Sequence, residues 1–384
     1  MPASRKVKPE AVRRVFEHFA ELEDPRIKRT RRHELLHVLV MTLCGAIAGA
    51  DGWEALAAFS HAKRKWFEGL FDLPNGTPSA DTFRRVLCAL EPREFEKCFR
   101  KWVDDVAASF KGEVIALDGK SLRGAVDHAG STSPLHLMQV WATKQRLVLA
   151  QRAVDGAAGE PAAIPELLKL LDLEGAVVTS DANGCTAATT VAVREAGADY
   201  LVALKGNRGP QYKHVRNAFE TADLKEISAS SKTNKGHGRI ETRTVYAMPA
   251  FGWTWADWRD VKTFVMIERR RLMVGAAPET ETVEVGFYLT SLPPKATALS
   301  KRIRAHWGIE NGLNWVLDVS FGEDRQLIRD RRGAENFAII TRLAHMLLRN
   351  EKTAKYGSTT KRKRAGWDDD YLALVLTRGL TEDS

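Results

Sequence analysis

EVIALDGK, residues 113–120, is the stretch on which the fold depends, because a short apolar run ends there in an acid and passes into a turn. The same arrangement returns in AVVTSDANG, residues 176–184. Around these two stretches, runs typical of strands alternate with runs typical of helices, namely 146–154, 163–173, 185–197 and 199–207. This alternation predicts an α/β layer with some parallel strand pairing.

Upstream of residue 111 the pattern is helical. Apolar positions recur at helical spacing in four segments, 11–22, 35–50, 52–71 and 93–110. Between them, Asn75 and Gly76 predict a turn, and Ser79 or Asp81 is expected to cap the next helix. We therefore expect a helical N-terminal domain over residues 1–110.

Downstream, the α/β pattern is interrupted before it ends. From about 225 to 295, β-branched and aromatic residues dominate without helical spacing, which predicts a β-rich insertion. Helical spacing returns at 299–317 and 333–350, so we expect the α/β domain to run from 111 to 349. Residues 350–384 are expected to form a basic segment, a linker followed by a short amphipathic stretch.

The composition is that of a folded, basic protein. Its 58 lysines and arginines outnumber its 49 acids, and the formal charge of +9 favours a polyanionic partner without distinguishing nucleic acid from a membrane surface. The longest uncharged run, 35–50, is shorter than the roughly 20 apolar residues of a membrane span. The first residues lack the apolar core of a secretory signal, so we expect a cytoplasmic protein. The four cysteines show no C-x-x-C pairing, which argues against a zinc site or a disulfide framework.

Asp118 and Asp181 are candidate metal ligands. Each closes an apolar run, and open α/β sheets bind ligands at the carboxyl ends of their strands. A third acid from a packed helix would complete a site of oxygen ligands suited to two Mg²⁺ or Mn²⁺ ions, which activate water or a 3′-hydroxyl for phosphoryl transfer. The alternative is structural, since aspartate is favoured in turns for its hydrogen bonds to the local backbone.

The candidate for the third acid lies in the stretch HWGIENGLNWVLDVSFGEDR, residues 306–325. On a helix from about 298 to 317, His306, Glu310 and Asn314 share one polar stripe, so Glu310 projects beside polar neighbours. His306 is either a core or capping residue or a phosphate contact. Glu323 and Asp324 are expected to be solvated acids in a loop. Trp307 and Trp315 are expected to pack the helix, and the alternative for either is to stack a flipped base.

Several stretches together resemble a known family. They include IALDGKSLRGA (115–125), AIPELLKLLDLEGAVVTSDANGC (163–185), DYLVALKGN (199–207), HWGIENGLNWVLDVSFGEDR (306–325) and KRKRAGWDDDYL (361–372). With others in the same order they span nearly the whole chain. The chain thereby resembles bacterial insertion-sequence transposases of the H-repeat-associated family, a branch of the DDE transposases with a ribonuclease H-like catalytic domain.

The resemblance implies a function and a site. It marks Asp118, Asp181 and Glu310 as three catalytic acids that hold two Mg²⁺ (or Mn²⁺) ions, and the β-rich stretch as the insertion that such enzymes place before the glutamate. The expected activity is cleavage at insertion-sequence ends and joining of those ends to target DNA. The expected partners are double-stranded DNA, both terminal inverted repeats and target, and a second copy of the chain in a homodimeric synaptic complex. Such a protein is expected on nucleoid DNA in the cytoplasm.

Contacts to DNA are expected from basic side chains. Candidates near the acids are Lys120, Arg123 and Lys205, together with His306, which stands where related transposases often carry an arginine toward the DNA backbone. A cluster in the C-terminal segment adds Lys361, Arg362, Lys363 and Arg364. Phosphate contacts of this kind weaken steeply with salt and carry no sequence information, and a single cluster is otherwise a solvated face.

The chain departs from the family pattern at four places. It has AAGE at 157–160 where the family reads K-S-N-E, Thr186 for a glutamine, Asn314 for a histidine, and Leu317 for a lysine expected seven residues after the glutamate. Two alternatives to an active transposase therefore stand. One is a catalytically impaired or repurposed DNA-binding protein, and the other is a structure-selective nuclease that does not join strands.

Overall fold

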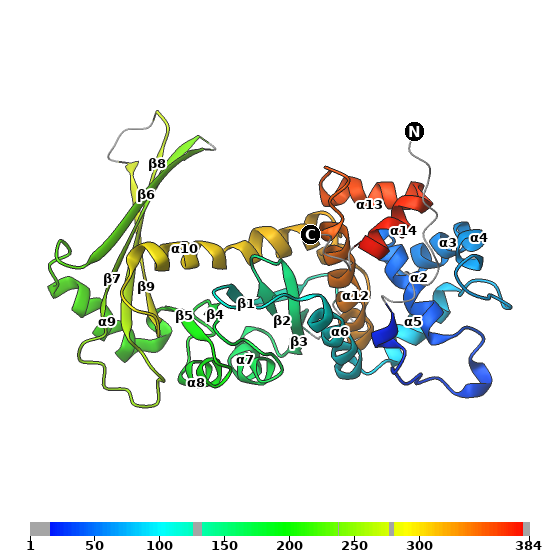
Figure 1. The fold of residues 1–384 in the computed structure, drawn as a ribbon, viewed down its shortest axis with the longest axis horizontal. Coiled ribbons are helices and arrows are strands. Elements are labelled where there is room, and N and C mark those ends of the chain that lie inside the picture. The colour runs from blue at the N-terminus through cyan, green and yellow to red at the C-terminus, as the bar shows by residue number, and fades with distance from the viewer. Residues whose placement is uncertain (1–15, 126–132, 237, 276–279, 379–384) are drawn as a thin grey trace.

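The computed structural model describes residues 16–125, 133–236, 238–275 and 280–378, and the molecule is elongated (Figure 1). Strands β6 to β9 occupy one end, helices from both ends of the chain occupy the other, and the α/β part lies between them. The helix expected at 11–22 begins outside the described residues, which contain a 3-10 turn at Glu17–Phe19.

All strands among the described residues belong to one nine-stranded sheet with the order β3-β2-β1-β4-β5-β9-β8-β7-β6. The strands β1, β4 and β5 run parallel, and the other neighbouring pairs are antiparallel. The strands are β1 (Val114–Leu122), β2 (Leu135–Ala142), β3 (Leu147–Val154), β4 (Val177–Ser180), β5 (Asp199–Leu204), β6 (Ser228–Gly236), β7 (Arg239–Pro249), β8 (Thr263–Met273) and β9 (Thr282–Thr290). The predicted α/β layer with partial parallel pairing is confirmed.

The predicted β-rich stretch forms strands that extend this sheet. β5 pairs with β9, so the insertion strands continue from the α/β part without a break. β2 escaped prediction, because it is buried at every position and shows no alternation. β6 lies within the predicted stretch, although it is largely polar and forms the outer edge of the sheet.

Helices cover the central strands on two sides. In Figure 1, α7 (Glu160–Leu168) and α8 (Ala187–Glu195) lie below them, and α10 (Ala296–His306) runs above them from the insertion to the centre. α9 (Gly209–Thr221) packs beside β9. The continuous helix expected over 298–317 is interrupted, because α10 ends at His306, a π-helical turn covers Glu310–Asn314, and α11 follows at Trp315–Val319.

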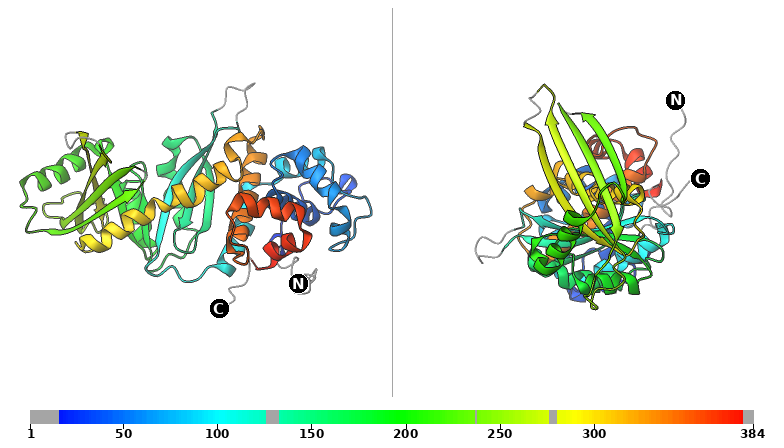
Figure 2. Two further views of the ribbon diagram at one scale, coloured as in Figure 1. Left: turned by 90° about the horizontal axis from the view of Figure 1, so that it is seen from above. Right: turned by 90° about the vertical axis from the view of Figure 1, so that its left-hand side faces the viewer.

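Helices from both ends of the chain form one layer. They are α2 (Leu35–Ala48), α3 (Trp53–Ala62), α4 (Arg64–Glu68), α5 (Ala80–Ala89), α6 (Pro92–Val106), α12 (Arg331–Asn350), α13 (Ser358–Trp367) and α14 (Asp369–Arg378). α12 packs against α2, α5 and α6, and α13 packs against α2. Figure 2 shows the red C-terminal helices beside the blue N-terminal ones. The basic run 361–364, expected in a linker, instead lies in α13, which is held by packing, and residues 351–357 connect it to α12.

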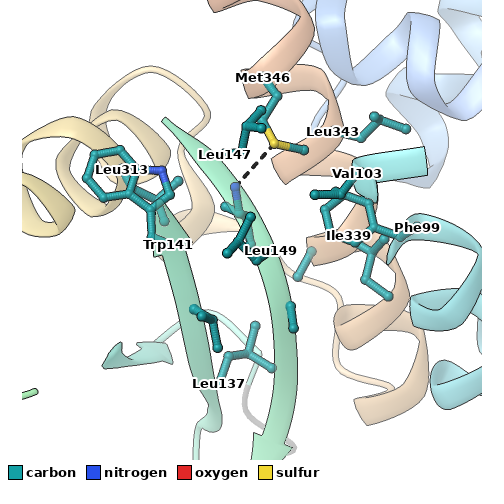
Figure 3. Packing of buried hydrophobic residues seen from close by; sticks show 14 of the residues in the cluster. Phe99, Val103, Leu137, Trp141, Leu147, Leu149, Leu313, Ile339, Leu343 and Met346 are labelled. Carbon is teal, nitrogen blue, oxygen red and sulfur yellow. Dashed lines mark hydrogen bonds between the residues drawn. The ribbon is translucent and has the colours of Figure 1, made fainter. Parts of the chain in front are cut away.

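α12 also joins the helical layer to the sheet (Figure 3). Leu149 of β3, Leu343 of α12 and Val103 of α6 are buried in the same hydrophobic cluster. The sulfur of Met346 accepts a hydrogen bond from the backbone N–H of Val148 at 3.3 Å. The layer and the α/β part thus share one hydrophobic core.

No single helix among the described residues is long and apolar enough to cross a membrane. α2 and α3 reach that length and composition only when taken together, and the chain bends by 97° between them.

Candidate active site at the end of strand β4

Asp118 and Asp181 are brought side by side by the register of two parallel strands. β1 and β4 pair up to Leu117 and Ser180, and each aspartate is the next residue of its chain segment. The β1–β4 pairing ends there, as expected for a ligand site at the carboxyl ends of strands. The expectation that Asp118 closes its own strand is wrong, because β1 continues to Leu122 through its pairing with β2.

Asp181 also makes the turn contacts that the structural alternative predicts. Its Oδ1 accepts hydrogen bonds from the backbone N–H groups of Asn183 at 3.0 Å and Gly184 at 3.3 Å. These bonds fix the direction of the carboxylate just beyond β4. They leave its role beside Asp118 open, since a carboxylate has several acceptor positions.

The strand behind Asp118 is packed tightly against α7. A Cβ at Gly119 would lie 1.9 Å from Glu160 Oε1, so glycine is needed in this position. His136 on β2 lies 2.6 Å from the same Glu160 oxygen through its Nε2, and its Nδ1 lies 2.8 Å from Ser121 Oγ. A buried His–Glu pair therefore supports β1 on the face opposite Asp118.

Glu310 is presented by the π-helical turn, a rare conformation that is frequent at functional sites. This segment lies on the ring of Trp141 from β2, where a Cβ at Gly312 would lie 2.6 Å from the ring and one at Gly308 would lie 3.4 Å from it. Leu313 points inward and is fully buried, whereas Glu310 is exposed. The close packing of this backbone segment on the Trp141 ring thus determines the position of Glu310.

A chain of hydrogen bonds, buried at α12 and partly buried at Asp118, reaches Asp118 from α12. Asn314 Nδ2 donates to Asp118 Oδ2 at 2.8 Å, and Gln139 Nε2 donates to Asn314 Oδ1 at 3.2 Å. Arg342 Nε donates to Gln139 Oε1 at 3.1 Å, and the same guanidinium pairs with the fully buried carboxylate of Glu323. The orientation of Asp118 is therefore tied to the helical layer.

The acids around Asp118 affect its protonation. Burial raises the pKa of Asp118 to about 7, with repulsion from Asp181 and then Glu310 acting in the same direction, while the hydrogen bond from Asn314 acts to lower it. Partial burial also raises the pKa of Glu310. Within the described ranges, no three His, Cys, Asp or Glu side chains lie close enough together to hold a metal ion. Asp181 and Glu310 are thus close enough to Asp118 to raise its pKa, but the three carboxylates do not meet at one metal-binding point.

His306 is uncharged at neutral pH. Burial lowers its pKa to about 4, although Asp181 acts to raise it. Its Nδ1 lies 2.9 Å from the Thr179 hydroxyl on β4. The side chain therefore ties the end of α10 to the sheet, which favours the core role over a charged phosphate contact.

The basic residues predicted near the acids differ in accessibility. Lys120 is buried, and its Nζ lies 2.5 Å from Asp318 and 4.0 Å from Asp324, so it is committed to internal ion pairs. Arg123 is 80% exposed and lies 3.7 Å from Asp324. Lys205 is exposed at the end of β5. Arg123 and Lys205 are thus accessible to phosphate, whereas Lys120 is not.

Half of the predicted C-terminal basic cluster is buried. Lys361 lies 3.3 Å from Glu351 and donates to main-chain carbonyls of the helical layer. Arg362 pairs with Asp51 at 2.7 Å, and its guanidinium lies 4.2 Å from the centre of the Phe321 ring. These two side chains, expected on DNA, instead hold α13 in place.

The remaining residues of the cluster reach the surface. Lys363 is exposed. Arg364 is half-buried over the Tyr371 ring, 4.3 Å from its centre, and lies 3.4 Å from Asp368. The surface available to a polyanion here is therefore smaller than the sequence predicted.

Three expectations for the stretch 306–325 are wrong. Glu323 is buried against Arg342 and is not solvated. Trp307 and Trp315 are 43% and 57% exposed, so neither is packed away in the core. Both tryptophans flank the π-helical turn that presents Glu310.

Three of the residues that depart from the family pattern, Leu317, Thr186 and Asn314, have structural roles here. Leu317 is fully buried, so its side chain does not reach solvent. Thr186 caps α8 by accepting a hydrogen bond from the Thr189 N–H at 3.0 Å. Asn314 provides the bond to Asp118, and Glu160, the residue of AAGE that the family shares, pairs with His136.

The residues behind the acids do not stand out in the sequence. Gln139, Arg342 and His136 each lie in a run that is otherwise apolar. The sequence signal for Gln139 and Arg342 is a polar residue in an apolar run, namely the glutamine in LHLMQVWA and the arginine in FAIITRLAHMLL. Such residues indicate buried hydrogen bonds, because polar groups in buried elements must find partners.

Comparison with known proteins gives the family. The family model described as "Transposase DDE domain" matches residues 109–347, and one described as "DDE_Tnp_1-associated" matches residues 16–103. The chain is 33% identical over 371 residues to the H repeat-associated putative transposase YhhI of Escherichia coli K12, covering 95% of this chain and 98% of that protein. It is 32% identical over 372 residues to the putative transposase YncI of Escherichia coli O157:H7, covering 95% of each.

A solved structure was also found. The piggyBac transposase synaptic complex with hairpin DNA covers 97% of this chain and 81% of that chain at 10% identity, but its TM-score of 0.43 is too low to support an argument. The family model alone spans more than half of the chain, and the relatives span nearly all of it. The resemblance found in the sequence is confirmed, and this chain belongs to the DDE transposase family.

Proposed function

We propose that this transposase cuts DNA at the ends of an insertion sequence and joins those ends to target DNA through Asp118, Asp181 and Glu310. The register of β1 and β4 is the observation that carries the proposal, since it sets the two aspartates on adjacent parallel strands. Glu310 lies near enough to raise the pKa of Asp118. The order β3-β2-β1-β4-β5, with β1, β4 and β5 parallel, supports a ribonuclease H-like catalytic domain.

The donor set fits hard divalent cations. Mg²⁺ and Mn²⁺ prefer carboxylate oxygens, and this site offers three carboxylates on three chain segments. The pKa of Asp118 is raised by burial and by repulsion from the carboxylates of Asp181 and Glu310. A bound cation would offset this repulsion between the carboxylates. When bound, two such ions supply an activated water or 3′-hydroxyl and neutralise charge on the phosphate.

The protein's own side chains orient the acids and the DNA. Asn314 fixes one oxygen of Asp118, and Gln139 fixes Asn314. Arg123 and Lys205 are exposed and provide positive charge for phosphates of the bound DNA. Two copies of the chain are proposed to act on double-stranded DNA together, because two element ends must be held at once.

The test uses purified protein, labelled DNA carrying the element's own ends, and Mg²⁺. Wild type is compared with Glu310→Gln and with a matched control, Glu195→Gln, which changes an exposed glutamate of α8. We expect wild type and Glu195→Gln to cleave and join DNA, and Glu310→Gln to bind DNA without cleaving it. Equal cleavage by wild type and Glu310→Gln would show that Glu310 is not a catalytic residue.

The same assay separates the alternatives. Cleaved ends without joined products would favour a structure-selective nuclease. Salt-sensitive binding without cleavage by any of the three proteins would favour a repurposed DNA-binding protein. That alternative is raised by the departures at 157–159, Thr186, Asn314 and Leu317.

A further inference from the structure

A second group of polar side chains lies on the face of β1 that is turned away from Asp118. Ser121 follows Asp118 by three residues on β1, and because side chains alternate along a strand the two point to opposite faces. Ser121 stands directly opposite His136 on the antiparallel neighbour β2. Glu160, the first residue of α7, reaches the same imidazole from the helix that packs on β2 and β3. Three chain segments thus bring a hydroxyl, an imidazole and a carboxylate together.

The three groups form one line of hydrogen bonds through the imidazole of His136. Its Nδ1 lies 2.8 Å from Ser121 Oγ, and its Nε2 lies 2.6 Å from Glu160 Oε1. A carboxylate only accepts hydrogen bonds, so Nε2 carries a proton and donates to Glu160. In a neutral imidazole the other nitrogen is then an acceptor, and Nδ1 accepts from the Ser121 hydroxyl. Glu160 therefore fixes the tautomer in which His136 can take the serine proton.

Burial divides the three groups into a buried pair and an accessible end. The side chains of His136 and Glu160 are 9% and 6% exposed, whereas Ser121 is an exposed residue. Gly119 makes room for the pair, because a Cβ there would lie 2.5 Å from His136 Nε2. Hydrogen bonds are stronger away from water, so the imidazole is held firmly in one orientation. Its outer nitrogen meets a hydroxyl that a reagent in solution can reach.

This geometry is the one that activates a serine nucleophile. A hydroxyl, a base and a group that orients the base stand within hydrogen-bonding distance of one another in that order. Such a constellation recurs on unrelated folds and is recognised by the roles of its members, not by their order in the sequence. In serine proteases the hydroxyl meets Nε2, whereas here it meets Nδ1. Either ring nitrogen can be the acceptor, since the partner of the other one decides the tautomer.

We propose that Ser121 is an activated nucleophile that accepts an acyl group from an activated ester. Its Oγ forms a bond to the carbonyl carbon while its proton passes to His136 Nδ1. The bond from that carbon to the leaving oxygen breaks with its electron pair, and the leaving oxygen takes the proton from Nδ1. The products are acyl-Ser121 and an alcohol. His136 is the general base and Glu160 is a positioning residue, and this reaction goes beyond the proposed function in DNA.

The experiment incubates the full chain with p-nitrophenyl acetate and EDTA and follows acetylation of single residues by peptide mass spectrometry. Ser231 on β6 is the internal reference, because it is also exposed but lies 3.1 Å from a cross-strand hydroxyl, that of Thr244, in place of an imidazole. General-base assistance contributes about 10²–10⁴-fold, so Ser121 should be acetylated at least about a hundredfold faster than Ser231. Equal rates at the two serines would overturn the proposal.

Variants separate the roles of the three side chains. His136→Gln should slow acetylation at position 121 about a hundredfold or more and leave Ser231 unchanged. Ser231→Ala is the matched control for Ser121→Ala, and only the latter should abolish the fast reaction. Fast acetylation of Ser121 that survives His136→Gln would show that the imidazole is not the base.

Glu160 needs a readout that a purely structural role would not change. In Glu160→Gln the side-chain amide can donate to Nε2, so the imidazole proton should move from Nε2 to Nδ1. The ¹⁵N chemical shifts of the His136 ring report this move, and acetylation of Ser121 should slow with it. Slower acetylation with the proton still on Nε2 would show that Glu160 does not act through the tautomer.

Melting temperatures are measured for each variant, because His136 and Glu160 are buried. If His136→Gln does not fold, the comparison of Ser121 with Ser231 within the wild-type chain still decides the question. The two proposals also fail separately. Normal cleavage of DNA ends with Ser121 no faster than Ser231 would remove the acyl-acceptor proposal alone, whereas fast acetylation in a protein that never cleaves would remove the proposed function alone.

Discussion

Asn314 donates a hydrogen bond to Asp118 at 2.8 Å, and it is the last link in a chain that begins at a buried ion pair on α12. Gln139 and Arg342, the links between, are fully buried. Away from water, an unpaired polar group is costly, so each link holds the next in one orientation. The helical layer thereby positions a candidate catalytic acid in the sheet.

The first prediction concerns Asn314. Asn314→Leu removes the donor to Asp118 and leaves the amide of Gln139 without its partner. A hydrogen bond to a charged group contributes about 1.5–3 kcal/mol, so cleavage of element ends at saturating DNA should slow roughly ten- to a hundredfold, with DNA binding unchanged. Asn314→His, the residue that the family carries, keeps a ring N–H donor and should retain most activity. Wild-type rates for Asn314→Leu would show that this bond does not position Asp118.

The second prediction concerns the buried ion pair. Arg342→Leu leaves the Glu323 carboxylate in the interior without its main partner, which should lower the free energy of unfolding by about 3–5 kcal/mol in urea titrations. The double variant Arg342→Leu with Glu323→Leu removes both charges and should recover much of that loss. If the double variant is as unstable as Arg342→Leu, the loss of stability comes from altered packing and not from the unpaired charge of Glu323.

The third prediction concerns the two glycines that rest on Trp141. A Cβ at Gly312 would come within 2.6 Å of the ring, so Gly312→Ala must displace the π-helical turn. Overpacking of this kind costs about 1–3 kcal/mol and should also reduce end cleavage, because Glu310 moves with the turn. Gly308→Ala is the matched control, since its Cβ would lie 3.4 Å from the same ring and needs little adjustment. Similar stability losses in both variants would contradict this account.

The fourth prediction concerns pH in the metal-free protein. The pKa of Asp118 is about 7 in the folded protein and near 3.8 without its surroundings, so the folded state binds this proton more tightly. Its contribution to stability is therefore fully present below about pH 4 and is lost as the pH rises through about 7. Asp118→Asn should raise the free energy of unfolding near pH 8 by at most about 4 kcal/mol and leave it unchanged near pH 3.

Urea titrations at the two pH values, with a chelator present, measure this difference. Asp105→Asn, on an exposed aspartate of α6, is the control. A gain for Asp118→Asn of the same size at both pH values would show that ionisation of the carboxyl is not its source.

The sequence predicted those parts of the site that depend on local pattern. The apolar run before Asp118 and the one before Asp181 each predict a buried strand, and the helices between them imply parallel pairing. Parallel pairing alone brings the two aspartates to one place. Ser79 likewise follows from a local rule, because it caps α5 by accepting from the Thr82 N–H.

The sequence did not predict what depends on distant contacts. Lys361 and Lys363 look alike in the run KRKR, yet Lys361 is buried against Glu351 and Lys363 is exposed, because only one face of α13 meets the helical layer. The π-helical turn at Glu310 depends on the approach of Gly312 to Trp141, far away in the sequence. No local pattern carries that information, since it arises when helix and sheet pack.

The interleaving of helices from the two ends of the chain sets an order of assembly. α2 is almost wholly buried, and its cover comes from α3 and α5 on one hand and from α12, α13 and α14 on the other. The N-terminal helices are synthesised first, so α2 stays partly uncovered until residues 331–378 have been made. α12 is also the helix that supplies Arg342 to the chain ending at Asp118. A nascent or shortened polypeptide therefore lacks both a closed helical layer and an oriented carboxylate, and the DNA cleavage that we propose requires the last helices.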